Sequence, residues 1–91
     1  MELRESVRHA VNWPVEFEQG SGVTRNMSAG GACIETPLAF DKGDAIHFTV
    51  RMPDRPGQPA RLLCEGRVVW VAVEDGDREL GVSLDKLEFG L

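Results

Sequence analysis

The chain has 91 residues, and the scaling of surface area with mass lets a chain of this length bury about 64% of its extended surface as one small domain. Its 42% hydrophobic and 27% charged residues exclude a disordered, collagen-like or coiled-coil chain. Fifteen acidic against ten basic residues give a net charge of -5, which argues against coating of nucleic acid or anionic membrane through a general positive field. We therefore expect a single domain over residues 1–91 that holds any anionic ligand locally.

The sequence shows neither a signal peptide nor an apolar run long enough to span a membrane. The amino-terminal stretch MELRESVRHAV lacks the apolar core of a signal peptide, and the longest apolar run, at 68–73, is far shorter than a bilayer span. We therefore expect a cytoplasmic protein with no membrane insertion. Cys33 and Cys64 have no neighbouring Cys or His at zinc-finger spacing, so we expect buried, reduced thiols and no metal site.

The first half of the chain predicts three short strands. Apolar and polar residues alternate over 11–17, which predicts a strand whose apolar face carries Trp13 into the core. Pro14 cannot donate to a sheet ladder, so we expect this strand at an edge or with a bulge. A glycine-rich turn follows, and then short strands are expected at 23–27 and 31–35.

The second half begins with the clearest strand of the chain. Alternation over 46–52 places His47 on the polar face, where we interpret it as a solvent-exposed histidine. The segment 53–59 holds three prolines and a glycine and predicts an exposed loop. A long β-branched strand is expected over 61–73, with a bulge at Gly66.

The end of the chain predicts a hairpin and a closing turn. Asp75 and Gly76 mark a tight hairpin turn, because glycine supplies positive φ without steric cost, and a last strand follows at 80–84. A single helical turn is expected over 85–91. About six short strands with almost no helical periodicity favour a closed antiparallel β-barrel over 11–84.

The sequence shows none of the common catalytic motifs. There is no Ser, His and Asp arrangement, no Gly-rich phosphate loop and no HExxH pair, so we expect no catalytic residues, no resident cofactor and no enzymatic activity. The acidic stretch 74–79 lacks the spacing of a calcium loop and is interpreted as a solvated hairpin turn.

Two polar groups remain as binding candidates. Arg4 and Arg8 lie four residues apart, either as a clamp on one ligand or as a frayed terminus that pairs with its own glutamates. In NMSAGG, an extended backbone projects Asn26 and Ser28 from one face, and the glycines allow close approach to the main chain; an ordinary polar turn is the alternative.

These two groups, in this order, resemble the two motifs of the PilZ domain, the bacterial receptor module for cyclic diguanylate (c-di-GMP). The first motif, RxxxR, is matched by Arg4 and Arg8, and the second, [D/N]xSxxG, by Asn26, Ser28 and Gly31. The resemblance covers nearly the whole chain, because strand text typical of the family also has counterparts here: RHAVNWPVEF, GACIET, GRVVWV and LGVSL. The resemblance implies a six-stranded antiparallel barrel.

The same resemblance implies a flexible arm and a role for each motif residue. Residues 1–10 would be the arm that folds over the ligand. Its two arginines would clamp phosphate oxygens and guanine edges, whose acceptors match the guanidinium fork. Asn26 and Ser28 would hydrogen-bond guanine on the barrel face, and Gly31 would leave room for it.

Three further positions are ligand-adjacent candidates. Leu3 stands where many similar domains carry another arginine, so binding of one ligand or of a stacked pair stays open. Gly30 permits close backbone approach, and Trp70 is interpreted as a core or core-edge aromatic, with a place at the border of the ligand site as the alternative.

The function expected from these observations is a non-enzymatic c-di-GMP receptor that passes its signal to a protein partner. The alternative is a PilZ-like interaction adaptor that binds no nucleotide. A barrel for single-stranded nucleic acid is disfavoured, because the chain has no Tyr, a net charge of -5 and both Trp residues in apolar strands.

Overall fold

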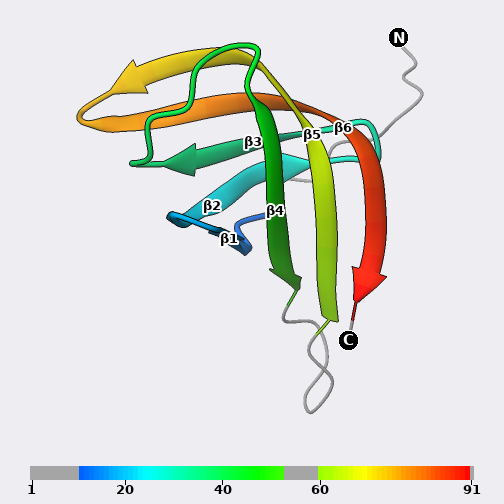
Figure 1. The fold of residues 1–91 in the computed structure, drawn as a ribbon. Helices are drawn as coiled ribbons and strands as arrows, with labels where there is room; N and C mark the ends of the chain where they lie inside the picture. Colours follow the sequence, from blue (N-terminus) through cyan, green and yellow to red (C-terminus); the bar gives the residue numbers. More distant parts are fainter. Residues whose placement is uncertain (1–10, 53–59, 91) are drawn as a thin grey trace, which may run out of the picture.

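The computed structural model describes residues 11–52 and 60–90, and these form one closed β-barrel (Figure 1). Its strands are β1 (Pro14–Phe17), β2 (Gly20–Met27), β3 (Gly31–Thr36), β4 (Ala45–Met52), β5 (Ala60–Glu74) and β6 (Asp77–Gly90). All neighbouring strands pair antiparallel in the order β1-β2-β3-β6-β5-β4, and β1 pairs with β4 to close the barrel. The predicted all-β, six-stranded antiparallel barrel is confirmed.

Alternating side chains of the strands fill the barrel. The most deeply buried apolar residues come from five different strands, which is typical of a small barrel filled by side chains: Val15, Ile34, Ile46, Val50, Val68 and Leu80. Phe17 lies with its ring centroid 5.0 Å from that of Phe40 and 5.8 Å from that of Phe48. Trp13 packs against this core from a half-buried position, as predicted for the apolar face of the first strand.

The segment that leads into β1 is fastened to β2 through one buried threonine. The Thr24 hydroxyl donates to the Val11 carbonyl at 2.6 Å and accepts from the Trp13 N–H at 2.9 Å. The Thr24 N–H donates to the Trp13 carbonyl, and the Asn12 side-chain amide donates to the Thr24 carbonyl, both at 2.9 Å. The chain that precedes the barrel therefore enters it beside β2.

We expect Thr24→Val to lower the free energy of unfolding by about 2 kcal/mol, because it keeps the side-chain shape but leaves the Val11 carbonyl and the Trp13 N–H without their partner. Urea unfolding measures this change. Thr49→Val is the matched control, because the half-buried Thr49 makes no hydrogen bond with its side chain to another described residue. Equal losses in both variants would contradict the role assigned to Thr24.

The carboxy-terminal segment differs from the sequence prediction. Residues 85–90 continue β6 instead of forming a helical turn, so the barrel extends beyond residue 84 to Gly90. Leu87 pairs with Cys64 of β5 and packs against the core. A ladder with the 15-residue β5 supplies more hydrogen bonds than an isolated helical turn retains.

The position of Pro14 also differs from the sequence prediction, whereas the bulge at Gly66 and the hairpin turn at Gly76 are confirmed. The strand β1 is not at an edge, because it pairs with β2 and with β4, but the β4 ladder takes in Val15 and Glu16 and leaves Pro14 outside. The β5–β6 register shifts at Gly66, as predicted, and the hairpin turn has φ of 50° at Asp75 and 86° at Gly76.

Candidate functional site

The second sequence motif lies where β2 turns into β3. The Ser28 N–H donates to the Gly31 carbonyl at 2.9 Å, and the Ser28 hydroxyl reaches the same oxygen at 3.4 Å. Met27 points into the core, so the alternation of the strand directs its neighbour Asn26 to the outer surface. The strand β2 ends at Met27, one residue before Ser28, so the placement of both side chains on one face stays a prediction.

Asn26 belongs to a row of outward-facing residues that crosses four strands. Asn26 pairs with Cys33, Cys33 with Gly81, and Gly81 with Trp70. Residues directly opposite each other in an antiparallel sheet share a face, and the alternate residue Ile34 is fully buried in the core, so this row lies on the outer face of the sheet, where Cys33 and Gly81 are themselves covered. It joins the motif on β2 to an aromatic ring on β5.

Trp70 lies over Gly81, not in the core. A Cβ built on Gly81 would come within 2.0 Å of the Trp70 indole nitrogen, and 44% of Trp70 is exposed. The core interpretation of Trp70 is therefore wrong. The register shift between Val68 and Trp70 turns the ring outward, and the missing side chain of Gly81 leaves the space beneath it.

Small residues form the floor around this row. Gly31 pairs with Ser83, and Ser83 with Arg67, in the neighbouring outward-facing row. The Gly30 carbonyl accepts from the Leu84 N–H at 3.1 Å, which ties the β2–β3 turn to β6. We call this surface the outer-face platform and define it by Asn26, Gly31, Cys33, Trp70, Gly81 and Ser83.

One arginine with two acids borders the platform. Arg25 stands at the register shift of β2, and its guanidinium lies 3.4 Å from the Glu35 carboxylate and 3.7 Å from that of Glu79. All three side chains are substantially exposed, so the ion pairs contribute little stability. The Arg25 guanidinium nevertheless holds these two carboxylates beside the platform and partly neutralises their charge.

The platform combines amide, hydroxyl and aromatic groups. Asn26 supplies a donor and an acceptor, Ser83 supplies a hydroxyl, and Trp70 supplies a flat π face. Such a surface suits a planar, hydrogen-bonding ring. The motif spacing predicted Asn26, Ser28 and Gly31, whereas Gly81 and Ser83 join them through strand pairing and carry no sequence signal of their own.

Arg4, Arg8 and Leu3 lie outside the described residues. The described chain begins at Val11, whose carbonyl is bound by the Thr24 hydroxyl. Thr24 precedes Asn26 by two positions on β2. The segment that begins at Val11 is thus joined to the strand that also carries Asn26.

Other candidate residues are placed as the sequence predicted. His47 is exposed on β4, 3.8 Å from Glu65. Cys33 and Cys64 are both buried, and they form no disulfide with a described residue. Burial raises the pKa of Cys64 to about 12, which keeps its thiol protonated. Among residues 11–52 and 60–90, no group of three or more His, Cys, Asp and Glu side chains is placed to hold a metal ion. Nor does this part of the chain contain a helix long and apolar enough to cross a membrane.

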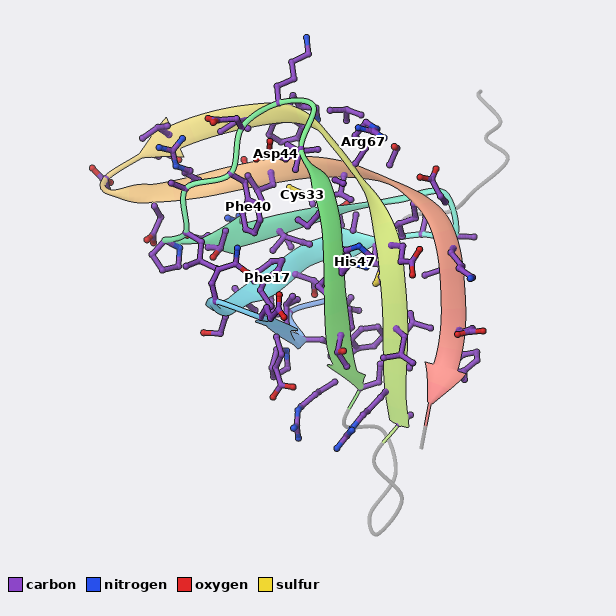
Figure 2. The ribbon with its side chains drawn as sticks, viewed as in Figure 1. Phe17, Cys33, Phe40, Asp44, His47 and Arg67 are labelled. Atoms are coloured by element: carbon purple, nitrogen blue, oxygen red, sulfur yellow. The ribbon has the colours of Figure 1, made fainter. Side chains whose placement is uncertain are left out.

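A hollow of about 840 Å³ is lined by residues of β1, β4, β5 and β6 and by the β1–β2 turn. Phe17, Phe40 and Phe48 line it, and Figure 2 shows Phe17 and Phe40 directed toward each other there. Its rim carries four carboxylates against one lysine and His47: Glu16, Glu18, Glu65, Glu88 and Lys86. An anionic ligand is therefore disfavoured at this hollow.

Comparison with known proteins agrees with this fold. The family model described as the PilZ domain matches residues 2–90. The chain belongs to the PilZ domain family. Among solved structures, that of the Bacillus subtilis inhibitor of motility (MotI/DgrA) is similar, with a TM-score of 0.79 and 19% sequence identity.

That similarity covers 97% of this chain and 45% of the other, so the chain spans less than half the length of that structural relative. At this level of identity, the likeness supports the PilZ fold alone. A comparison with curated proteins gave no match.

We expect Gly81→Ala to displace the Trp70 ring, because the new Cβ occupies the place of the indole nitrogen. The indole N–H signal of Trp70 in a ¹H–¹⁵N NMR spectrum measures the change. Gly30→Ala is the matched control, because a Cβ at Gly30 meets open space. An unmoved Trp70 signal in Gly81→Ala would contradict the placement of the ring.

Proposed function

We propose that the protein is a non-enzymatic c-di-GMP receptor whose ligand lies on the outer-face platform. The observation that carries the proposal is the row from Asn26 to Trp70, because it joins the second PilZ motif to an exposed aromatic face. Membership of the PilZ family supports the choice of ligand. In this proposal the protein acts in the bacterial cytoplasm, where the second messenger is made.

The attachment of the chain to β2 supports a contribution from the first motif. Arg8 precedes Val11 by three residues, so an extended chain keeps its Cα within about 11 Å of the Val11 Cα. Arg4 precedes Val11 by seven residues, which sets a limit of about 25 Å. Both limits are long enough for the arginines to reach a ligand beside Asn26, since Val11 is bonded to Thr24 on the same strand.

The chemistry of guanine fits the groups available. The Asn26 amide oxygen can accept from the guanine N1–H and N2–H₂ groups, and the arginine forks match the O6 and N7 acceptors. The Trp70 indole offers a stacking face. The two phosphates require local cations because the net charge of the chain is -5, and Arg4 and Arg8 would supply them.

Signal transfer would follow from ordering of residues 1–10 over the ligand. Fixing a backbone costs about 1 to 2 kcal/mol per residue, so the ligand contacts must offset that cost. The newly ordered segment and the ligand would together form a surface that a protein partner recognises. The proposal names no partner beyond this.

Isothermal titration of c-di-GMP into the protein tests the proposal, with the Arg4→Ala, Arg8→Ala double variant as control. We expect saturable binding heat with the parent protein and none with the double variant. The stoichiometry of binding to the parent decides between one ligand and a stacked pair. Absence of heat in the parent at high protein concentration would overturn the proposal.

The alternative is a protein-interaction adaptor that binds no nucleotide, and the apolar hollow beside β4 favours it. Thermal unfolding separates the two functions. Ligand at 100 times its dissociation constant stabilises a receptor by about 2.7 kcal/mol, whereas an adaptor melts at the same temperature with and without c-di-GMP.

A further inference from the structure

The bulge in β2 places a cation beside the motif asparagine. The β2–β3 pairing skips Arg25, which is the extra residue at the register shift. The nearest buried side chains on either side are Thr24 and Met27, so two residues separate them where regular alternation allows one. Arg25 and Asn26 therefore both lie outside the core as neighbours on the strand, and the Arg25 side chain is exposed.

Two glutamates lie opposite each other in the outward-facing row next to the platform. Glu35 of β3 pairs with Glu79 of β6, and the residue that follows each of them toward the platform is fully buried in the core. Glu35 is two positions from Cys33, and Glu79 is two positions from Gly81, which corresponds to about 7 Å along a strand. Like charges directly opposite in an antiparallel pair repel each other, and at this distance both would also repel an anion on the platform.

The Arg25 guanidinium bridges these two carboxylates. Its Nη1 atom lies 3.4 Å from Oε1 of Glu35, as a hydrogen bond, and 3.7 Å from Oε2 of Glu79. Within residues 11–52 and 60–90, neither carboxylate forms an ion pair with another cation. Two carboxylates and one guanidinium give this group a net charge of -1, which becomes -2 when the guanidinium is removed.

We propose that Arg25 is a positioning residue that opens the platform to an anionic ligand by neutralising Glu35 and Glu79, without touching the ligand itself. The inference rests on the proposed function, because the anion is the ligand of the platform. The guanidinium is held in the glutamate row and not in the row that carries Asn26. Exposed ion pairs contribute little to stability, so we expect Arg25 to act on ligand affinity and not on folding.

The expected effect is moderate and depends on salt. A unit charge on the order of 10 Å from a phosphate changes a binding constant by about twofold to fifteenfold for effective dielectric constants of about 80 to 20. Added salt screens such an interaction, because the Debye length falls from about 30 Å at 0.01 M ionic strength to about 8 Å at 0.15 M. Loss of a direct charge-assisted contact would be larger than this and less sensitive to salt.

Titration calorimetry with c-di-GMP at two ionic strengths tests the role of Arg25. Arg25→Gln should bind about threefold to tenfold more weakly than the parent at ~0.01 M ionic strength, and the difference should shrink to at most about twofold at ~0.15 M. Arg51→Gln is the matched control, because Arg51 is an exposed arginine that pairs with Glu16 at 2.8 Å on the other side of the barrel wall. It makes the same change in net charge and should stay within about twofold of the parent at both ionic strengths.

Removal of an acid separates neutralisation from direct contact. The Arg25→Gln, Glu79→Gln double variant restores the local charge of -1 and should bind as tightly as the parent. Glu79→Gln alone should bind more tightly than the parent at low salt. Urea unfolding of Arg25→Gln should match that of the parent, which shows that the loss of affinity does not come from the fold.

The outcomes distinguish this inference from the proposed function. If the parent binds c-di-GMP and Arg25→Gln binds as Arg51→Gln does, the role of Arg25 is overturned and the receptor function stands. If the double variant stays as weak as Arg25→Gln, the arginine contacts the ligand directly and neutralisation is overturned. If the parent itself does not bind, the receptor function is overturned, and the role of Arg25 with it.

Discussion

Arg8→Ala should weaken c-di-GMP binding by about 30-fold to 1,000-fold, which corresponds to about 2 to 4 kcal/mol. This range is typical of removing one partner from a charge-assisted pair in a partly desolvated site. The loss rests on the proposed function, because Arg8 would meet phosphate or guanine acceptors while the second motif holds the other side of the ligand. Titration calorimetry of the single variant measures it.

The matched control is Arg61→Ala, which removes an exposed arginine from the barrel wall away from the platform. Its affinity should stay within about twofold of the parent, because a distant surface charge contributes little to a ligand held locally. If Arg8→Ala binds c-di-GMP as tightly as Arg61→Ala does, the first motif is not part of the proposed site.

Gly66→Val should lower the free energy of unfolding by about 3 kcal/mol, at the upper end of the range for overpacking. A Cβ at Gly66 would stand 1.9 Å from the backbone carbonyl oxygen of Ser83, and backbone cannot move aside as a side chain can. The β5–β6 register shifts at this residue, so relief of the clash would disturb the bulge itself.

Urea unfolding measures the Gly66→Val effect, with Gly30→Val as control, because Gly30 has open space around its Cα. The control should lose less than about 0.5 kcal/mol, as exposed substitutions usually do. A similar midpoint for both variants would show that the bulge tolerates a side chain, contrary to the packing at Ser83.

Most of the barrel was predictable because its signals are local. Alternation over 46–52 marks one face of β4, and a glycine inside a long β-branched run marks the bulge at Gly66. The hairpin turn followed from Asp75 and Gly76, whose positive φ values match the residue types.

The end of β6 and the position of Trp70 were not predictable from local pattern. A polar stretch after Leu84 is compatible with a helical turn, and only the distant pairing of Leu87 with Cys64 makes it a strand. The run VVWVAV has no alternation to show which residues face outward. The register shift before Trp70 and the absence of a side chain at Gly81, eleven residues later, decide its direction.

The candidate site was predictable in its motifs and not in its shape. Residue types and spacing identified Asn26, Ser28 and Gly31, since those features are readable along one chain segment. The floor of the platform combines four strands, and the apolar hollow combines β1, β4, β5 and β6. Contacts between segments this far apart leave no local signal in one sequence.

The most direct test of the account is a ¹H–¹⁵N NMR titration of the protein with c-di-GMP. The account predicts that the largest shifts fall on the outer-face platform, at the amides of Asn26, Gly31 and Gly81 and at the Trp70 indole, while β4 amides near His47 stay in place. No shifts, or shifts gathered around the hollow beside β4, would contradict it.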